Sequence, residues 1–164
     1  MIKKTNIKWL TRTAILLAIA LIFQMGGFPQ FITGPFINAV LFLAATIVGW
    51  QGGALIGILT PVIAVMRGIL PPPLVPLIPF IALGNGVLVI LFFWLKSKNK
   101  IISIIIASVV KFLILVTVVN LIVQVPTPVA QVMSVPQLIN AISGGIIALI
   151  VEKLLFRGGL KLTN

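Results

Sequence analysis

Long apolar stretches, separated by short connections rich in proline, glycine or basic residues, dominate this sequence. Most of them approach the ~20 residues that a helix needs to span a bilayer. The stretches lie at 9–25, 35–49, 51–68, 76–95, 101–123 and 134–156. Because backbone groups in lipid must bond within their own segment, and the alternation of a barrel strand is missing, helices are the expected structure. The pattern predicts an all-α integral membrane protein, a bundle of six transmembrane helices, with residues 1–164 forming a single membrane domain.

The composition supports this assignment. Hydrophobic residues form 60% of the chain, charged residues form 8%, and the mean hydropathy is +1.30, so a water-exposed surface cannot be assembled from it. We therefore expect a multi-pass protein whose surroundings are the lipid bilayer. The net charge of +11 does not indicate nucleic-acid binding, because the basic residues flank apolar runs instead of interleaving with aromatic residues.

Ten of the twelve basic residues form three clusters at the ends of apolar stretches. The clusters are Lys3, Lys4, Lys8 and Arg12; Lys96, Lys98 and Lys100; and Lys153, Arg157 and Lys161. Six spans place all three clusters on one side of the membrane, and the positive-inside rule makes that side cytoplasmic. Both termini are therefore expected in the cytoplasm. The connections 26–34, 69–75 and 124–133 are expected outside, as stiff loops that contain proline and lack charge.

Four stretches carry a resemblance to a known family. They are TRTAILLA at 11–18, GPFINA at 34–39, VGWQGGA at 48–54 and PLIPFIALGN at 76–85. Together with the chain length and six spans with both termini inside, they resemble the substrate-binding S-components of energy-coupling factor (ECF) vitamin transporters. The resemblance covers essentially the whole chain and rests on the combination of these features.

The resemblance implies a subunit in a prokaryotic plasma membrane that captures a small water-soluble vitamin or related micronutrient from outside for ATP-driven uptake. In this family an alanine-spaced first helix docks on a shared transmembrane T-component, which implies a docking role for Ala14 and Ala18. The T-component is coupled to two cytoplasmic ATPases. Because this chain has no P-loop sequence, we expect no enzyme activity from it, and ATP hydrolysis is expected in the other subunits.

Polar residues within the apolar stretches indicate where a substrate could bind. A polar side chain at membrane depth costs several kcal/mol unless it lines a cavity or finds a partner. Most of these residues fall in the outer half of the predicted bundle, and several at one level favour a pocket over isolated helix–helix hydrogen bonds. The candidates for substrate binding are Asn38, Arg67, Asn85, Asn120, Gln124, Gln137 and Asn140.

Two basic residues, Arg67 and Lys111, stand apart from the clusters. Helical side chains lean towards the helix N-terminus, so Arg67 is predicted to lean back into the membrane, where its guanidinium would suit a substrate carboxylate. The alternative for Arg67 is contact with lipid headgroups. Lys111 lies about half a turn away from Asn120 around the helix, so it is not expected to share the Asn120 face. An ion pair between Lys111 and Glu152, the only acid in the chain, is predicted, with a substrate or coupling role as the alternative.

Other function classes fit the residue inventory less well. A membrane enzyme would have to work without histidine, cysteine or aspartate, and with a single glutamate, so we expect neither a metal nor a cofactor. A channel or ion-coupled carrier outside the ECF class would usually need carboxylates in its pathway, and a structural membrane subunit is the remaining alternative. Tyrosine is absent and tryptophan falls near the inner boundary, which favours a ligand with little aromatic surface.

Overall fold

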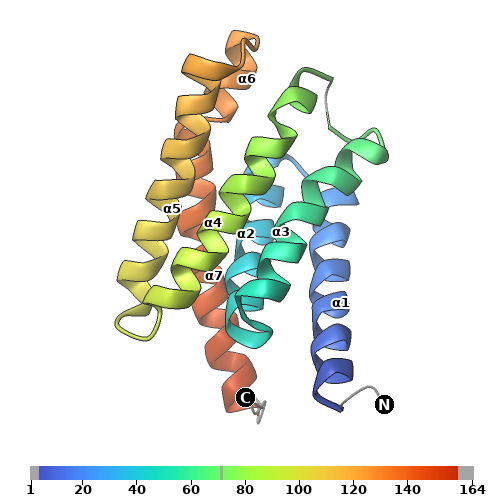
Figure 1. Ribbon diagram of the computed structural model, residues 1–164, viewed down its shortest axis with the longest axis vertical. Coiled ribbons are helices and arrows are strands. Elements are labelled where there is room, and N and C mark those ends of the chain that lie inside the picture. Colours follow the sequence, from blue (N-terminus) through green and yellow to red (C-terminus); the bar gives the residue numbers. More distant parts are fainter. Residues whose placement is uncertain (1–3, 71, 159–164) are drawn as a thin grey trace.

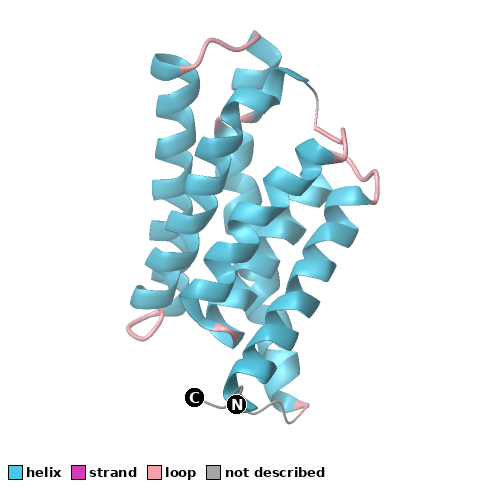
Figure 2. Ribbon diagram, turned by 45° about the vertical axis from the view of Figure 1, so that its right-hand side comes forward, coloured by secondary structure: helices cyan, strands magenta, loops and turns pink. Residues whose placement is uncertain are grey.

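The computed structural model describes residues 4–70 and 72–158 and shows a bundle of six long helices (Figure 1). These are α1 (Lys4–Met25), α2 (Gln30–Ile47), α3 (Gly49–Met66), α4 (Ile78–Leu95), α5 (Lys100–Thr117) and α7 (Val135–Arg157). Three short segments complete the described chain: the 3-10 turn η1 (Pro72–Leu77), the π-helical turn η2 (Val118–Ile122) and the helix α6 (Thr127–Val132). Figure 2 shows loops only as short links between these helices.

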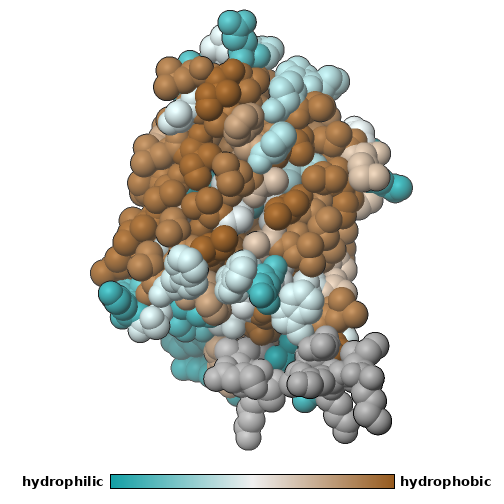
Figure 3. All heavy atoms as spheres, in the orientation of Figure 1, coloured by the Kyte–Doolittle hydropathy of each residue, from teal (hydrophilic) through white to brown (hydrophobic). Residues whose placement is uncertain are grey.

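Within residues 4–70 and 72–158, six helical segments are long and apolar enough to cross a membrane. Large apolar side chains such as Ile22, Leu55 and Ile146 are exposed on their outer faces. On the face drawn in Figure 3, a broad apolar surface lies between hydrophilic residues near the two ends of the molecule. The predicted all-α fold with six membrane spans is therefore confirmed. The beginning of α1 and the end of α7 lie at the same end of the bundle (Figure 1).

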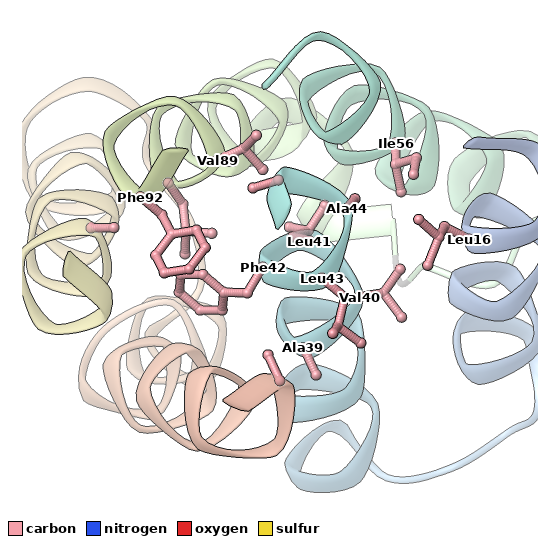
Figure 4. Close-up of a cluster of buried hydrophobic side chains, with 14 of the residues drawn as sticks. Leu16, Ala39, Val40, Leu41, Phe42, Leu43, Ala44, Ile56, Val89 and Phe92 are labelled. Carbon is pink, nitrogen blue, oxygen red and sulfur yellow. The ribbon is translucent and has the colours of Figure 1, made fainter. Parts of the chain in front are cut away.

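Helix α2 forms the centre of the bundle. Residues 39–45 are buried without interruption, so this part of α2 has no side that faces lipid. Helices α1, α3, α4 and α7 all pack against it, and its side chains fill the core that Figure 4 shows. The rings of Phe42 and Phe92 meet edge to face, with centroids 4.8 Å apart. A polar residue beside this buried run, such as Asn38, must therefore face the interior of the protein.

Glycines allow neighbouring helices to approach closely at two levels. A Cβ added at Gly144 of α7 would lie 2.6 Å from both Asn38 Cβ and Pro35 O of α2. A Cβ added at Gly57 of α3 would lie 2.9 Å from Asn85 Cβ of α4. Real Cβ contacts are longer, so only glycine fits at these positions. Both close approaches bring an asparagine of the neighbouring helix into the interior.

Several helix boundaries near prolines differ from the predicted ones. The second stretch was predicted to begin at residue 35. In the structure α2 begins one turn earlier, where Pro29 O accepts hydrogen bonds from the backbone N–H groups of Ile32 and Thr33, and Pro35 lies inside the helix. The connections expected at 69–75 and 124–133 are also not simple loops, since they contain most of η1 and all of α6.

Side chains from α1 and from the residue after α4 bond the backbone at the end of α2. Lys96 Nζ donates to Ala45 O at 2.9 Å, and Trp9 Nε1 donates to Val48 O at 2.8 Å. Such carbonyls have no partner within their own helix, so these donors satisfy them. Burial lowers the pKa of Lys96, and Glu152 opposes that shift. This end of the bundle is thus held together by polar contacts as well as by apolar packing.

Candidate substrate-binding site

A cavity of about 410 Å³ lies at the end of the bundle opposite the start of α1 and the end of α7. Every long helix contributes to its wall, and η1 and α6 flank it near the ends of the helices. Most of the lining is apolar. The described lining residues are Gln24, Phe28, Gln30, Thr33, Gly34, Ile37, Asn38, Thr60, Pro61, Ile69, Leu70, Leu74, Ile81, Asn85, Lys111, Pro128, Val129, Val132, Met133 and Gln137.

Among these described lining residues, Lys111 is the one that carries a charge. It lies on the inward face of α5, together with the buried residues Ala107 and Leu115, which are four positions before and after it. Its side chain is 3% exposed and passes over Gly84 of α4, where an added Cβ would lie 3.3 Å from Lys111 Cγ. Its Nζ donates a hydrogen bond to Asn38 Oδ1 at 2.7 Å. The cavity therefore contains a buried ammonium group whose observed partner is a neutral amide.

The predicted ion pair between Lys111 and Glu152 was wrong. Glu152 Oε1 accepts a hydrogen bond from Lys100 Nζ at 2.5 Å instead. Lys100 begins α5, and Lys111 lies eleven residues further along it, which places it about 16 Å away along the helix axis. Glu152 is level with the beginning of α5, so it cannot reach both lysines. Since Glu152 is the only acid in the chain, no side-chain carboxylate is left to neutralise Lys111.

Asn85 of α4 provides a second polar group in the cavity lining. It is 3% exposed, and its Nδ2 donates to Gly57 O of α3 at 2.9 Å. The other amide atom, Oδ1, is buried and has no hydrogen-bond partner among the described residues. A buried polar atom without a partner costs about 1–3 kcal/mol, which is unusual unless a ligand or water completes the site.

The structure brings together some of the residues that the sequence indicated and separates others. Asn38, Asn85 and Gln137 are buried and line the cavity, and Lys111 joins them. Asn140 is also buried, but it packs against Gly34 and is not among the lining residues. Three predicted residues are exposed and lie outside the lining: Arg67, Asn120 and Gln124.

The exposed positions have simple geometric reasons. Arg67 is the residue after the last residue of α3, Met66, and its side chain is exposed instead of lying within the bundle. Asn120 lies on the side of α5 and η2 opposite Lys111, as the half-turn separation indicated, and its Nδ2 donates to Val116 O of its own chain segment. The two residues lie on separate faces as predicted, but the cavity lies on the Lys111 face and not on the Asn120 face.

Besides Lys111, four uncharged polar lining residues were not among the predicted binding residues: Gln24, Gln30, Thr33 and Thr60. Gln24 lies at the end of α1, and Gln30 and Thr33 lie at the start of α2, in a segment that was taken for a loop. Thr60 follows Gly53 and Gly57 along α3 at helical spacing, a signal that could have placed it on the inward face. Its hydroxyl donates to Ile56 O, so its oxygen can still accept a hydrogen bond.

A membrane bundle with a small, mostly apolar cavity and a few buried polar groups is the architecture of a protein that binds a small molecule within the membrane. The chain belongs to the family of ECF transporter substrate-specific components, whose family model matches residues 8–156. No curated protein and no solved structure matches the chain. Membership of the family confirms the resemblance and makes the chain a multi-pass plasma-membrane subunit that binds substrate without catalysis of its own. It also sets aside the channel and structural-subunit alternatives.

Proposed function

We propose that this S-component captures a small nutrient that carries an anionic group, and that Lys111 binds this group inside the cavity. The observation that carries the proposal is the buried Lys111 ammonium, which lines the cavity while the only acid of the chain is bonded to Lys100. An isolated cation is expensive to bury in a membrane protein and marks a functional site by default. A carboxylate or phosphate on the substrate would supply the missing negative charge.

The geometry supports this role for Lys111. An ammonium group has three hydrogens, and the described contacts use one of them, on Asn38 Oδ1. Hydrogen bonds between an ammonium and a carboxylate or phosphate are roughly twice as strong as neutral ones. A substrate anion can therefore bind the remaining hydrogens, or displace Asn38 from Lys111. Lys111 thus takes the role of anion-binding residue that was predicted for Arg67.

The remainder of the cavity favours an aliphatic substrate. Phe28 is the aromatic side chain among the described lining residues, and the walls otherwise consist of residues such as Ile37, Ile81, Leu74 and Met133. A volume of about 410 Å³ lies within the usual range for small-molecule sites. A small acid with a short aliphatic body would fill this space without requiring stacked rings.

We also propose that the cavity opens to the outside and that the chain works with an ECF module. The three basic clusters favour cytoplasmic termini by the positive-inside rule, which would place the cavity at the outer side. On α1, Thr13, Leu16 and Ala20 are buried in the bundle, whereas Ala14 and Ala18 are exposed and available for a T-component. That subunit and its two ATPases would supply the energy for uptake.

Native mass spectrometry of the chain purified from cell membranes tests the proposed substrate chemistry. We expect a bound small molecule that proves to be a carboxylic or phosphoric acid when it is released. The Lys111→Met variant should be purified without it, because the ammonium that binds the acid is missing. Arg67→Gln serves as a matched control and should retain it, since Arg67 is exposed and outside the cavity lining. A neutral or cationic ligand, or full retention by Lys111→Met, would contradict the proposal.

A further inference from the structure

The unpartnered oxygen of Asn85 lies beside the proposed anion site. Asn85 lines the cavity, and its Oδ1 is fully buried without a hydrogen-bond donor among the described residues. Gly84, the preceding residue, is the position over which the Lys111 side chain passes. Asn85 and Lys111 therefore belong to neighbouring parts of the same cavity wall.

Pro61 explains why Asn85 presents an oxygen and not an amide N–H. In a regular helix the carbonyl of Gly57 would accept a hydrogen bond from the backbone N–H of residue 61. Residue 61 is a proline, which has no N–H, so Gly57 O is left without its helical donor. Asn85 Nδ2 fills that vacancy at 2.9 Å. Because a carbonyl oxygen can only accept, the NH₂ group of Asn85 must face Gly57, and the acceptor Oδ1 is left for another donor.

A purely structural role accounts for Asn85 Nδ2 but not for Asn85 Oδ1. The link between α3 and α4 needs only the Nδ2 group, and Gly57 already allows the two helices to meet. The link leaves Oδ1 as a buried acceptor without a donor among the described residues, and Asn85 is a residue that lines the cavity. The geometry is that of an acceptor prepared for a ligand.

We infer that the substrate carries an O–H or N–H group close to its anionic group, and that Asn85 Oδ1 accepts a hydrogen bond from this donor. The substrate class is then a small aliphatic hydroxy acid or amido acid, bound by Lys111 at the acid and by Asn85 at the hydroxyl or amide. This inference rests on the proposed function, because it places the donor relative to the anion that Lys111 binds. A site that hydrogen-bonds a substrate hydroxyl discriminates strongly against the analogue that lacks it.

The test uses two matched probes, leucic acid and isocaproic acid, which differ by a single hydroxyl group next to the carboxylate. Thermal unfolding of the detergent-purified chain, freed of bound ligand, reports binding of each acid, since a ligand that binds only the folded state raises its stability. We expect leucic acid to bind about tenfold more tightly than isocaproic acid, which corresponds to one satisfied buried acceptor.

Three variants assign the effect to Asn85. In Asn85→Leu the two acids should bind equally, because the acceptor is gone. The double variant Pro61→Ala with Asn85→Leu returns a backbone N–H to Gly57 O. If Asn85→Leu alone does not fold, this double variant tests whether the preference for leucic acid depends on Asn85. Asn120→Leu is the matched control and should keep the tenfold preference, because Asn120 is exposed and bonded within its own segment.

The outcomes separate this inference from the proposed function. Equal binding of both acids by the unaltered chain, lost in Lys111→Met, would overturn the donor site and leave the anion site intact. A preference for leucic acid that survives in the Asn85→Leu variants would also overturn it. Binding of neither acid would count against the anion site itself and thus against the proposed function. The acid released from the native protein provides an independent check, since it must contain an O–H or N–H near its anionic group.

Discussion

Replacement of Lys111 by methionine is the most informative perturbation of this protein. Methionine keeps most of the length and the apolar stem of lysine but removes the ammonium group. In the structure that group donates to Asn38 Oδ1 at 2.7 Å and is otherwise without a described partner. We expect Lys111→Met to abolish tight substrate binding while leaving the ligand-free protein as stable as before, or more stable.

The expected change in substrate affinity and the expected change in unfolding free energy follow from different contacts. Removing one partner of a buried, hydrogen-bonded charge pair costs about 2–5 kcal/mol. At about 1.4 kcal/mol for each tenfold change, affinity should fall roughly 30-fold to several thousand-fold. In the ligand-free protein the loss of a buried cation relieves about 2.5–3.5 kcal/mol. Leaving Asn38 Oδ1 without a donor costs about 1–3 kcal/mol. The net change in unfolding free energy should lie between a loss of about 0.5 and a gain of about 2.5 kcal/mol.

Affinity and stability can be measured on the same purified samples. Calorimetric titration gives the affinity for the acid released from the native protein, and thermal unfolding without ligand gives the stability. Arg67→Gln removes a cation at an exposed position and should change neither. The reasoning from the buried ammonium would be refuted if Lys111→Met bound the acid within about threefold of the unaltered chain. It would also be refuted if the variant lost clearly more than about 0.5 kcal/mol of unfolding free energy.

Three further predictions address packing, charge and partner docking. Gly144→Ala should lower the unfolding free energy by about 1–3 kcal/mol, because the new Cβ would collide with α2, whereas Gly86→Ala meets nothing within 4 Å and should stabilise α4 slightly; thermal unfolding compares the two. Lys100→Met and Glu152→Gln should show a coupling of only about 0.2–1 kcal/mol in a double-mutant cycle, because the Lys100 side chain is 45% exposed. A fully additive pair of losses would contradict the observed ion pair. Ala18→Trp should reduce ATP-driven uptake by cells but not ligand binding by the purified chain, since Ala18 is exposed on α1 and is not part of the cavity lining. Equal uptake with the tryptophan would argue against docking at this face.

The spans were predictable because membrane insertion depends on length and apolarity, which are properties of a segment and not of its neighbours. The structure confirms six such segments within the described residues. Several boundary errors fall near prolines. Pro35 lies inside α2, and proline-containing stretches that were taken for loops form η1 and α6, because neighbouring segments supply the contacts that a short helix needs.

The polar lining of the cavity was predictable only in part. Asn38, Asn85 and Gln137 could be named in advance, because a buried amide in an apolar helix needs a partner or a cavity. Which of two opposite faces of α5 turned inward could not be derived, because both carry polar residues, and so Asn120 was preferred to Lys111. Which face lines the cavity depends on how α5 is rotated against α4 and α7. The sequence of a single helix does not specify this rotation.

The sequence by itself determined the membrane location, the six helices, the family and the presence of a single acid among twelve basic residues. The tertiary structure decided how those few charges are paired. Glu152 reaches Lys100 and not Lys111 because they lie at different levels of α5, about 16 Å apart. The separation of the two lysines follows from α5 alone, but the level at which Glu152 of α7 lies beside α5 is set only when the helices pack. The buried cation without an acid, which carries the proposed function, is therefore a property of the folded bundle and not of any segment within it.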